Sequence, residues 1–245
     1  MMLQSRLGRA RHLLRHTSLC LSTPPAATRP LATLAPIQGH EGKLVVVTGG
    51  AHGIGRSVCH AFANAGAKVL CVDFDSAGGA EAVAEAEAMS GEVKFMEADM
   101  QDSAMPAAII AAAREWQGGK PVSTLVNNVG IQEDNGTPCH LLDEAIWDKV
   151  MDVNLKSYFL MAKYALPGMI DSSDGVIINM ASVQGHQSQV GIPAYASSKG
   201  GILSLTRQIA MDYSASGIRC VSVSPGYTTD SESKLYPCSP ASRSH

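Results

Sequence analysis

The sequence predicts an α/β fold with a doubly wound parallel sheet of about six strands, and three observations point to it. Short apolar runs alternate with longer segments of helical pattern from Lys43 onward. The runs are continuously apolar, which is typical of strands covered on both faces. A glycine cluster follows the first run directly, where such folds turn from strand to helix. This alternation favours right-handed crossovers between parallel strands.

The expected elements follow in strict order along the chain. Strands are predicted over residues 44–48, 68–73, 93–97, 124–129, 176–180 and 218–224. Helices are predicted over residues 56–65, 76–89, 104–117, 142–169 and 195–214. No internal repeat is found, so one domain over residues 41–230 is expected, a size that can bury a substantial core.

Composition excludes several classes of function. A net charge of −3 gives no electrostatic reason to expect a nucleic-acid partner. No apolar run approaches the roughly 20 residues that a membrane span requires. The six cysteines are scattered without a Cys-x-x-Cys pair, so no metal site is expected and buried reduced thiols are the better interpretation.

The first forty residues differ from the rest of the chain. They contain five arginines and no acidic residue before Glu41. Leu3, Leu7 and Leu14 would share one side of a helix, as in a mitochondrial transit peptide. We therefore expect residues 1–40 to direct the protein to the mitochondrial matrix. The alternative is that they form a disordered extension without a targeting signal and that the protein is cytoplasmic. Residues 231–245 are predicted to form an irregular polar tail.

The segment TGGAHGIG, residues 48–55, is predicted to bind a dinucleotide phosphate. Gly49 suits a tight turn, Gly53 permits close approach of a pyrophosphate, and Gly55 permits close helix–strand packing. Ile54 belongs to the same loop, whose helix N-terminus offers free N–H groups to phosphates. The strand–turn–helix context is that of a Rossmann fold, and a purely structural turn is the alternative.

An aspartate at the end of the second strand indicates the type of dinucleotide. Asp73 lies eighteen residues after Gly55, where a carboxylate can bind the adenosine ribose hydroxyls and would repel a 2′-phosphate. This favours NAD over NADP. Asp73 could instead cap a helix, and the neighbouring Asp75 could take either part.

Four residues are candidates for the chemistry. Tyr195 and Lys199 are four apart, on one face of the last predicted helix. Ser182 comes thirteen residues earlier, where the carboxyl end of a strand faces the cofactor crevice. Asn154 lies inside a predicted helix, where an amide side chain suggests a special role. The alternative is that Tyr195 and Lys199 are ordinary helix-surface residues.

With these residues together, residues 42–230 resemble a short-chain dehydrogenase/reductase of the single-domain type. The segment 48–55 matches that family's Thr-Gly-x-x-x-Gly-x-Gly, and residues 127–130 resemble its Asn-Asn-Ala-Gly. The resemblance implies the catalytic residues Asn154, Ser182, Tyr195 and Lys199. It implies a cofactor site made by Gly49, Gly53, Ile54, Gly55, Asp73, Asp99, Met100, Asn127, Asn128, Gly130, Tyr195, Lys199, Pro225, Gly226 and Thr228.

The resemblance also implies a mechanism for interconverting an alcohol and a carbonyl with NAD(H). A tyrosine phenol has an ordinary pKa near 10, so Tyr195 would need the nearby ammonium of Lys199 to exchange a proton near neutrality. Ser182 would hydrogen-bond the substrate oxygen. Asn154 would hold a water that links Lys199 to solvent. The partner is a small-molecule substrate, and Gln184, His186 and Gln189 could face it or could be loop surface.

The sequence departs from the family pattern near its C-terminus. The family pattern Pro-Gly-x-x-x-Thr begins here at Pro225, and Asp230 stands where the pattern has its threonine. Thr228 and Thr229 are therefore both candidates for the role of that threonine. About fifty further residues, with a helical lid and a seventh strand, would be expected by analogy. Their loss, as in a truncated isoform, would leave the sixth strand as an edge and weaken a family-like homo-oligomer. The alternative function is a catalytically impaired dinucleotide-binding protein.

Overall fold

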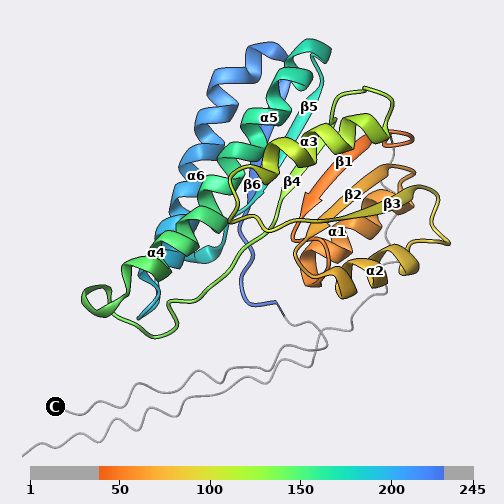
Figure 1. The fold of residues 1–245 in the computed structure, drawn as a ribbon. Helices are drawn as coiled ribbons and strands as arrows, with labels where there is room; N and C mark the ends of the chain where they lie inside the picture. The colour runs from red at the N-terminus through yellow and green to blue at the C-terminus, as the bar shows by residue number, and fades with distance from the viewer. Residues whose placement is uncertain (1–38, 229–245) are drawn as a thin grey trace, which may run out of the picture. The chain divides into compact units, whose positions relative to one another are not determined.

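Six parallel strands form the centre of the structure, a computed structural model that describes residues 39–228 (Figure 1). Their order across the sheet is β3-β2-β1-β4-β5-β6. The strands are β1 (Leu44–Thr48), β2 (Lys68–Asp73), β3 (Glu92–Glu97), β4 (Thr124–Asn127), β5 (Gly175–Met180) and β6 (Ile218–Val223). The doubly wound Rossmann fold is confirmed. The predicted targeting segment up to residue 38 and the predicted tail lie outside the described residues.

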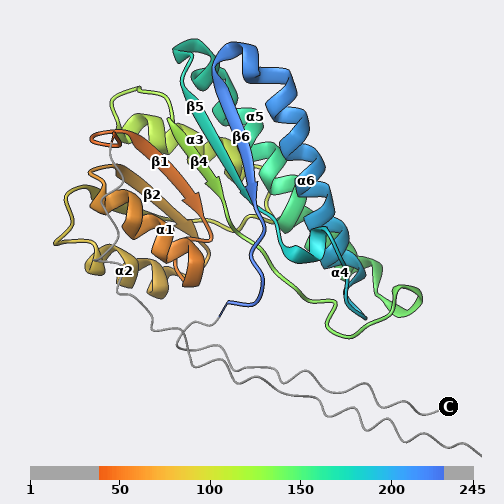
Figure 2. The ribbon, with the colours of Figure 1, turned by 180° about the vertical axis from the view of Figure 1, so that it is seen from behind.

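Helices cover the sheet on both faces. They are α1 (Gly53–Asn64), α2 (Ser76–Glu85), α3 (Met105–Trp116), α4 (Glu144–Met151), α5 (Ser157–Ser172) and α6 (Pro193–Tyr213). The helices α3, α5 and α6 lie on one face, whereas α1 and α2 lie on the other, over the strands β1 to β3 (Figures 1 and 2). This is the arrangement that right-handed crossovers produce when the strand order reverses beside β1.

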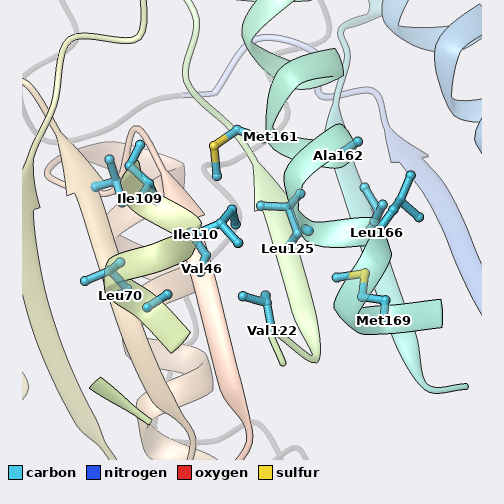
Figure 3. Close-up of a cluster of buried hydrophobic side chains, with 14 of the residues drawn as sticks. Val46, Leu70, Ile109, Ile110, Val122, Leu125, Met161, Ala162, Leu166 and Met169 are labelled. Carbon is cyan, nitrogen blue, oxygen red and sulfur yellow. The ribbon is translucent and has the colours of Figure 1, made fainter. Parts of the chain in front are cut away.

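The core explains why the strands are continuously apolar. Every residue of β1 is buried, because its side chains alternate between two clusters. Val46 packs with Ile109 of α3 and Met161 of α5 (Figure 3). Val45 and Val47 pack on the opposite face with α1 and α2. Burial of both faces of each strand therefore replaces the usual polar–apolar alternation.

The prediction of one continuous helix over residues 142–169 is wrong. The segment is divided into α4, a π-helical turn η3 (Asp152–Lys156) and α5. A π turn inserts one extra residue per turn and changes which side chains face inward, and such turns are common at functional sites. Here it carries Asn154, which is fully buried. The strand predicted over residues 124–129 ends earlier, at Asn127, where the chain turns toward the glycine loop.

The strand β6 lies at the edge of the described sheet. Val221 and Val223 are 49% and 45% exposed. Within residues 39–228 no helix covers β6 on the face of the sheet that carries α1 and α2 (Figure 2). None of the helices in this range is long and apolar enough to cross a membrane.

Candidate active site

Two adjoining cavities open at the carboxyl ends of the parallel strands, where the strand order reverses between β1 and β4. The larger, of about 450 Å³, lies beside the glycine loop and the end of β2. The smaller, of about 280 Å³, lies beside the ends of β5 and β6. Asn128, Gly130 and Ile131 line both cavities, so a single extended molecule could occupy the two.

The glycine loop is packed too tightly for larger side chains. Gly49 has φ +64°, and a Cβ there would lie 2.8 Å from Cα of Val129. A Cβ on Gly55 would lie 1.8 Å from the carbonyl oxygen of Gly49. Asn128, which directly follows the neighbouring strand β4, holds this loop in place. Its Nδ2 donates to the carbonyls of Thr48 and Gly49 at 3.1 and 2.9 Å. The result is a cradle of backbone that can approach a phosphate closely.

Asp73 and Asp75 have different roles. Asp75 caps α2 by accepting from the Ala77 N–H at 3.0 Å, and a hydrogen bond from His52 holds the pKa of its carboxyl below the usual value. Asp73 is only 9% exposed and accepts from the Ala51 N–H at 3.0 Å, so it fixes the glycine loop. It also lines the larger cavity. The capping alternative raised from the sequence therefore belongs to Asp75.

The buried ammonium of Lys199 lies between two tyrosines. Its Nζ is 5.6 Å from the ring centre of Tyr195 and 5.8 Å from that of Tyr158, and it donates to the Met180 carbonyl at 2.9 Å. Lys199 is 3% exposed, and this burial lowers its pKa to about 8. A Cβ on Gly130 would lie 3.2 Å from Nζ, so a larger residue at 130 would crowd the ammonium.

Ser182 and Tyr195 line the smaller cavity with Lys199. Ser182 lies just past β5, and its hydroxyl oxygen accepts from the Gln184 N–H at 3.2 Å. That contact orients the oxygen and leaves the hydroxyl proton free to be donated into the cavity. A phenol, an ammonium and a hydroxyl donor thus converge on one space.

Asn154 contributes by holding a neighbouring loop. Its Oδ1 accepts from the Ile131 N–H at 2.8 Å, and its Nδ2 donates to the Ile131 carbonyl at 2.9 Å. The same Nδ2 donates to Oγ of Ser198 at 3.1 Å. The amide therefore joins the loop after β4 to the helix that carries Tyr195 and Lys199.

Thirteen of the predicted site residues line the two cavities. They are Gly49, Asp73, Asp99, Met100, Asn128, Gly130, Ile54, Ser182, Tyr195, Lys199, Pro225, Gly226 and Thr228. Gly53, Gly55, Asn127 and Asn154 do not line them. Asn127 is fully buried in the sheet, where its side chain donates to Asn179 Oδ1 at 2.9 Å. Thr229 lies outside the described residues.

Sequence reasoning missed Tyr158. This side chain is fully buried, which raises the pKa of its phenol, and its hydroxyl donates to the Val129 carbonyl at 2.8 Å. The hydroxyl also lies 3.3 Å from the Met180 carbonyl, so it bridges the ends of β4 and β5. Tyr158 follows Asn154 by four residues, a spacing that places the two on one face of a helix and could have indicated a place in the site. A tyrosine in an apolar helix, however, ordinarily belongs to the hydrophobic core.

A third cavity, of about 240 Å³, adjoins Ser182 and Tyr195 on the outer side. Its lining residues are uncharged: Gln132, Ser182, Val183, Gln184, Gln189, Tyr195, Gly226, Tyr227 and Thr228. Gln184 and Gln189 thus lie where the sequence suggested that they face a substrate. His186 contacts Oγ of Ser224 at 3.1 Å and lines an adjoining groove, which shares Gln184 and Gln189 with this cavity.

Comparison with known proteins identifies the family. The model of the short chain dehydrogenase family matches residues 43–235, so the chain belongs to the short-chain dehydrogenase/reductase family. It is thereby an oxidoreductase of a family that binds a nicotinamide dinucleotide and acts on small molecules.

Individual relatives agree with this placement. A 2-(S)-hydroxypropyl-CoM dehydrogenase of Xanthobacter autotrophicus is 40% identical over 191 residues, which are 76% of this chain and 72% of the relative. The crystal structure of levodione reductase has a TM-score of 0.73 at 33% identity, covering 77% of this chain and 72% of that one. A metagenomic short-chain oxidoreductase in complex with NADP also has a TM-score of 0.73, at 30% identity, covering 77% of this chain and 84% of that one.

Proposed function

We propose that this protein uses NAD(H) to interconvert a secondary alcohol and a carbonyl compound. One observation carries the proposal: Ser182, Tyr195 and Lys199 line a single cavity that continues into the glycine-loop cavity. A substrate oxygen in the smaller cavity would then meet a proton-exchanging phenol and a hydroxyl donor together.

The residues present fit a dinucleotide. The backbone cradle at Gly49 and Gly55 would hold the phosphates, and Asp73 would bind the adenosine ribose hydroxyls. Lys199 has three donors and uses one on Met180, so it keeps donors for the nicotinamide ribose. When bound, the nicotinamide accepts or supplies the hydride.

Charge at the ribose end supports NAD over NADP. The larger cavity has the carboxylates of Asp73 and Asp99 in its lining, which would repel a 2′-phosphate. Arg56 is close in the sequence, but its guanidinium donates to the Ala51 and Gly78 carbonyls and pairs with Glu81 and Glu85. It is therefore not available for a phosphate.

Tyr195, Lys199 and Ser182 each have a separate role in handling the proton and the charge of the substrate oxygen. During alcohol oxidation, the Tyr195 phenolate accepts the hydroxyl proton of the substrate; during reduction, the phenol returns it. The Lys199 ammonium stabilises the phenolate through its charge. Ser182 donates its free proton to the substrate oxygen, which stabilises the negative charge that develops there. The uncharged outer cavity favours a neutral substrate.

The test is cofactor binding followed by turnover, using the full chain. NADH and NADPH are titrated separately, and NADH is expected to bind more tightly, with Asp73→Ala weakening NADH binding. Cyclohexanol and butan-2-ol are then assayed with NAD⁺, and their ketones with NADH. Tyr195→Phe should abolish turnover but retain NADH binding, whereas Tyr164→Phe, at a partly exposed tyrosine of α5, should change neither. NADH binding without turnover would favour the impaired dinucleotide-binding alternative, and absence of binding would refute both.

We also propose that residues 1–40 target the protein to mitochondria, on the basis of their arginines and the absence of acidic residues. The test is to fuse this segment to a fluorescent protein. Mitochondrial fluorescence is expected, and a version with its arginines replaced by glutamine should stay in the cytoplasm. Cytoplasmic fluorescence of the unmodified fusion would refute the proposal.

A further inference from the structure

The helix that carries Tyr195 and Lys199 cannot cap its own N-terminus. The residue before α6 is Ile192, which has no hydrogen-bonding side chain, and the first helical residue is Pro193, which has no N–H. The N–H groups of the first helical turn need acceptors from elsewhere. The Tyr195 N–H lies in this turn.

That acceptor comes from a distant loop. Asp134 Oδ2 accepts from the Tyr195 N–H at 2.9 Å, across 61 residues of chain. Asp134 is fully buried, and its Oδ1 has no hydrogen-bond partner among the described residues. A buried carboxylate without an ion partner is costly, so its retention at this point needs a specific reason. Negative charge at a helix N-terminus is favourable, which partly offsets the cost.

The loop is built to hold this aspartate in place. The Thr137 N–H donates to the Asp134 carbonyl at 2.9 Å, which closes a turn containing Gly136 at φ +76°. A Cβ on Gly191 would lie 2.5 Å from the Gly136 backbone, so the turn packs directly against the segment that leads into α6.

Tyr195 is thereby fixed at both main-chain polar groups. Its N–H is held by Asp134, and its carbonyl accepts from Oγ of Ser198 at 2.7 Å. Ser198 accepts from Asn154, and Asn154 holds both polar groups of Ile131, three residues before Asp134. Together with the chain between residues 131 and 134, these hydrogen bonds close a ring through the backbone of the proposed proton-exchanging residue.

From this geometry we propose that Asp134 is a positioning residue for Tyr195. It touches neither the cofactor cavities nor the reacting atoms; it acts through the Tyr195 backbone and sets where the phenol lies relative to Ser182 and Lys199. This inference rests on the proposed function, because it assigns the purpose of the contact to the chemistry of Tyr195.

The experiment compares Asp134→Ala, which removes the acceptor, with Asp134→Asn, which keeps an acceptor oxygen at the same place. Asp143→Ala is the matched control, because Asp143 caps α4 through an equivalent 2.9 Å bond to the Ala145 N–H and its capping bond is to α4, not to α6. Hydrogen exchange at the Tyr195 amide, NADH affinity, and kcat and KM for cyclohexanol and butan-2-ol with NAD⁺ are measured on the full chain. If Asp134→Ala does not fold, Asp134→Ser, whose hydroxyl is too short to reach, replaces it.

Asp134→Ala should accelerate exchange at the Tyr195 amide and lower kcat about 10- to 100-fold, the scale of loss from small misplacement of a reacting group. NADH affinity should be unchanged, Asp134→Asn should restore exchange and kcat, and Asp143→Ala should change neither. Unaltered exchange or unaltered kcat in Asp134→Ala would overturn the proposal, as would equal loss in both Asp134 variants. If the unmodified protein turns over neither alcohol, or Tyr195→Phe is fully active, the proposed function fails and the purpose assigned to Asp134 fails with it. The exchange data would still show whether the contact exists.

Discussion

Replacing Lys199 by methionine should make the cofactor-free protein more stable while abolishing its activity. Lys199 is 3% exposed, and burial lowers its pKa from 10.5 to about 8. This lowering corresponds to about 3 kcal/mol of stability that folding loses at neutral pH by keeping this group charged. Methionine fills a similar volume without a charge.

Part of this gain is offset by a lost hydrogen bond. Lys199 donates to the Met180 carbonyl, although Tyr158 remains near the same oxygen. A bond from a charged donor contributes about 1.5–3 kcal/mol, so a net stabilisation of at most about 2 kcal/mol is expected at pH 7. For a chain of this size each kcal/mol of that stabilisation corresponds to a rise in melting temperature of about 2–4 °C.

The pH dependence of the free energy of unfolding separates the effect of the Lys199 charge from the effect of the change in side-chain shape. Between pH 8 and pH 10.5 the unfolded chain binds more protons at Lys199 than the folded protein does, so the stability of the unmodified protein rises with pH in this window. Its stability relative to Lys199→Met should therefore increase by roughly 2–3 kcal/mol between pH 7 and pH 10. Urea unfolding at both pH values measures this, with the exposed Lys163→Met as the control. A difference that does not change with pH would refute the reasoning.

Three further predictions concern the site. Ser182→Ala should lower kcat about 10²- to 10³-fold with NADH affinity unchanged, because it removes a donor to the substrate oxygen; equal kcat in steady-state assays would contradict this. Gly55→Ala should abolish NADH binding in calorimetric titration, because its Cβ would overlap the Gly49 carbonyl. Gly118→Ala, which is strained by its φ of +66° but has nothing within 4 Å, should bind normally. Tyr158→Phe should cost about 1–3 kcal/mol in urea unfolding by leaving the Val129 carbonyl without its donor, and Tyr164→Phe should cost little.

The sequence by itself determined the architecture and most of the residues that line the site. Continuously apolar runs predicted strands covered on both faces, and the order of glycine loop, Asp73, Ser182, Tyr195 and Lys199 predicted which strand ends would meet. These signals are local: the spacing of four residues in a helix, or the position after a strand, places a side chain whatever the rest of the chain does.

Tertiary structure decided how those residues are held. The π turn at Asn154 breaks a helical pattern that the sequence shows as continuous, because hydrogen bonds to Ile131 favour it. Asn127 and Asn128 are adjacent and identical, yet Asn127 bonds within the sheet and Asn128 holds the glycine loop, because β4 ends between them.

Asp134 is the clearest case. In the sequence it is one polar residue in a loop, and no spacing connects it with Tyr195. Its partner is set by close packing of Gly136 on Gly191 and by a helix that begins with isoleucine and proline and so lacks a cap of its own. Contacts between residues far apart in the chain depend on how the loops pack, and only the folded structure contains that information.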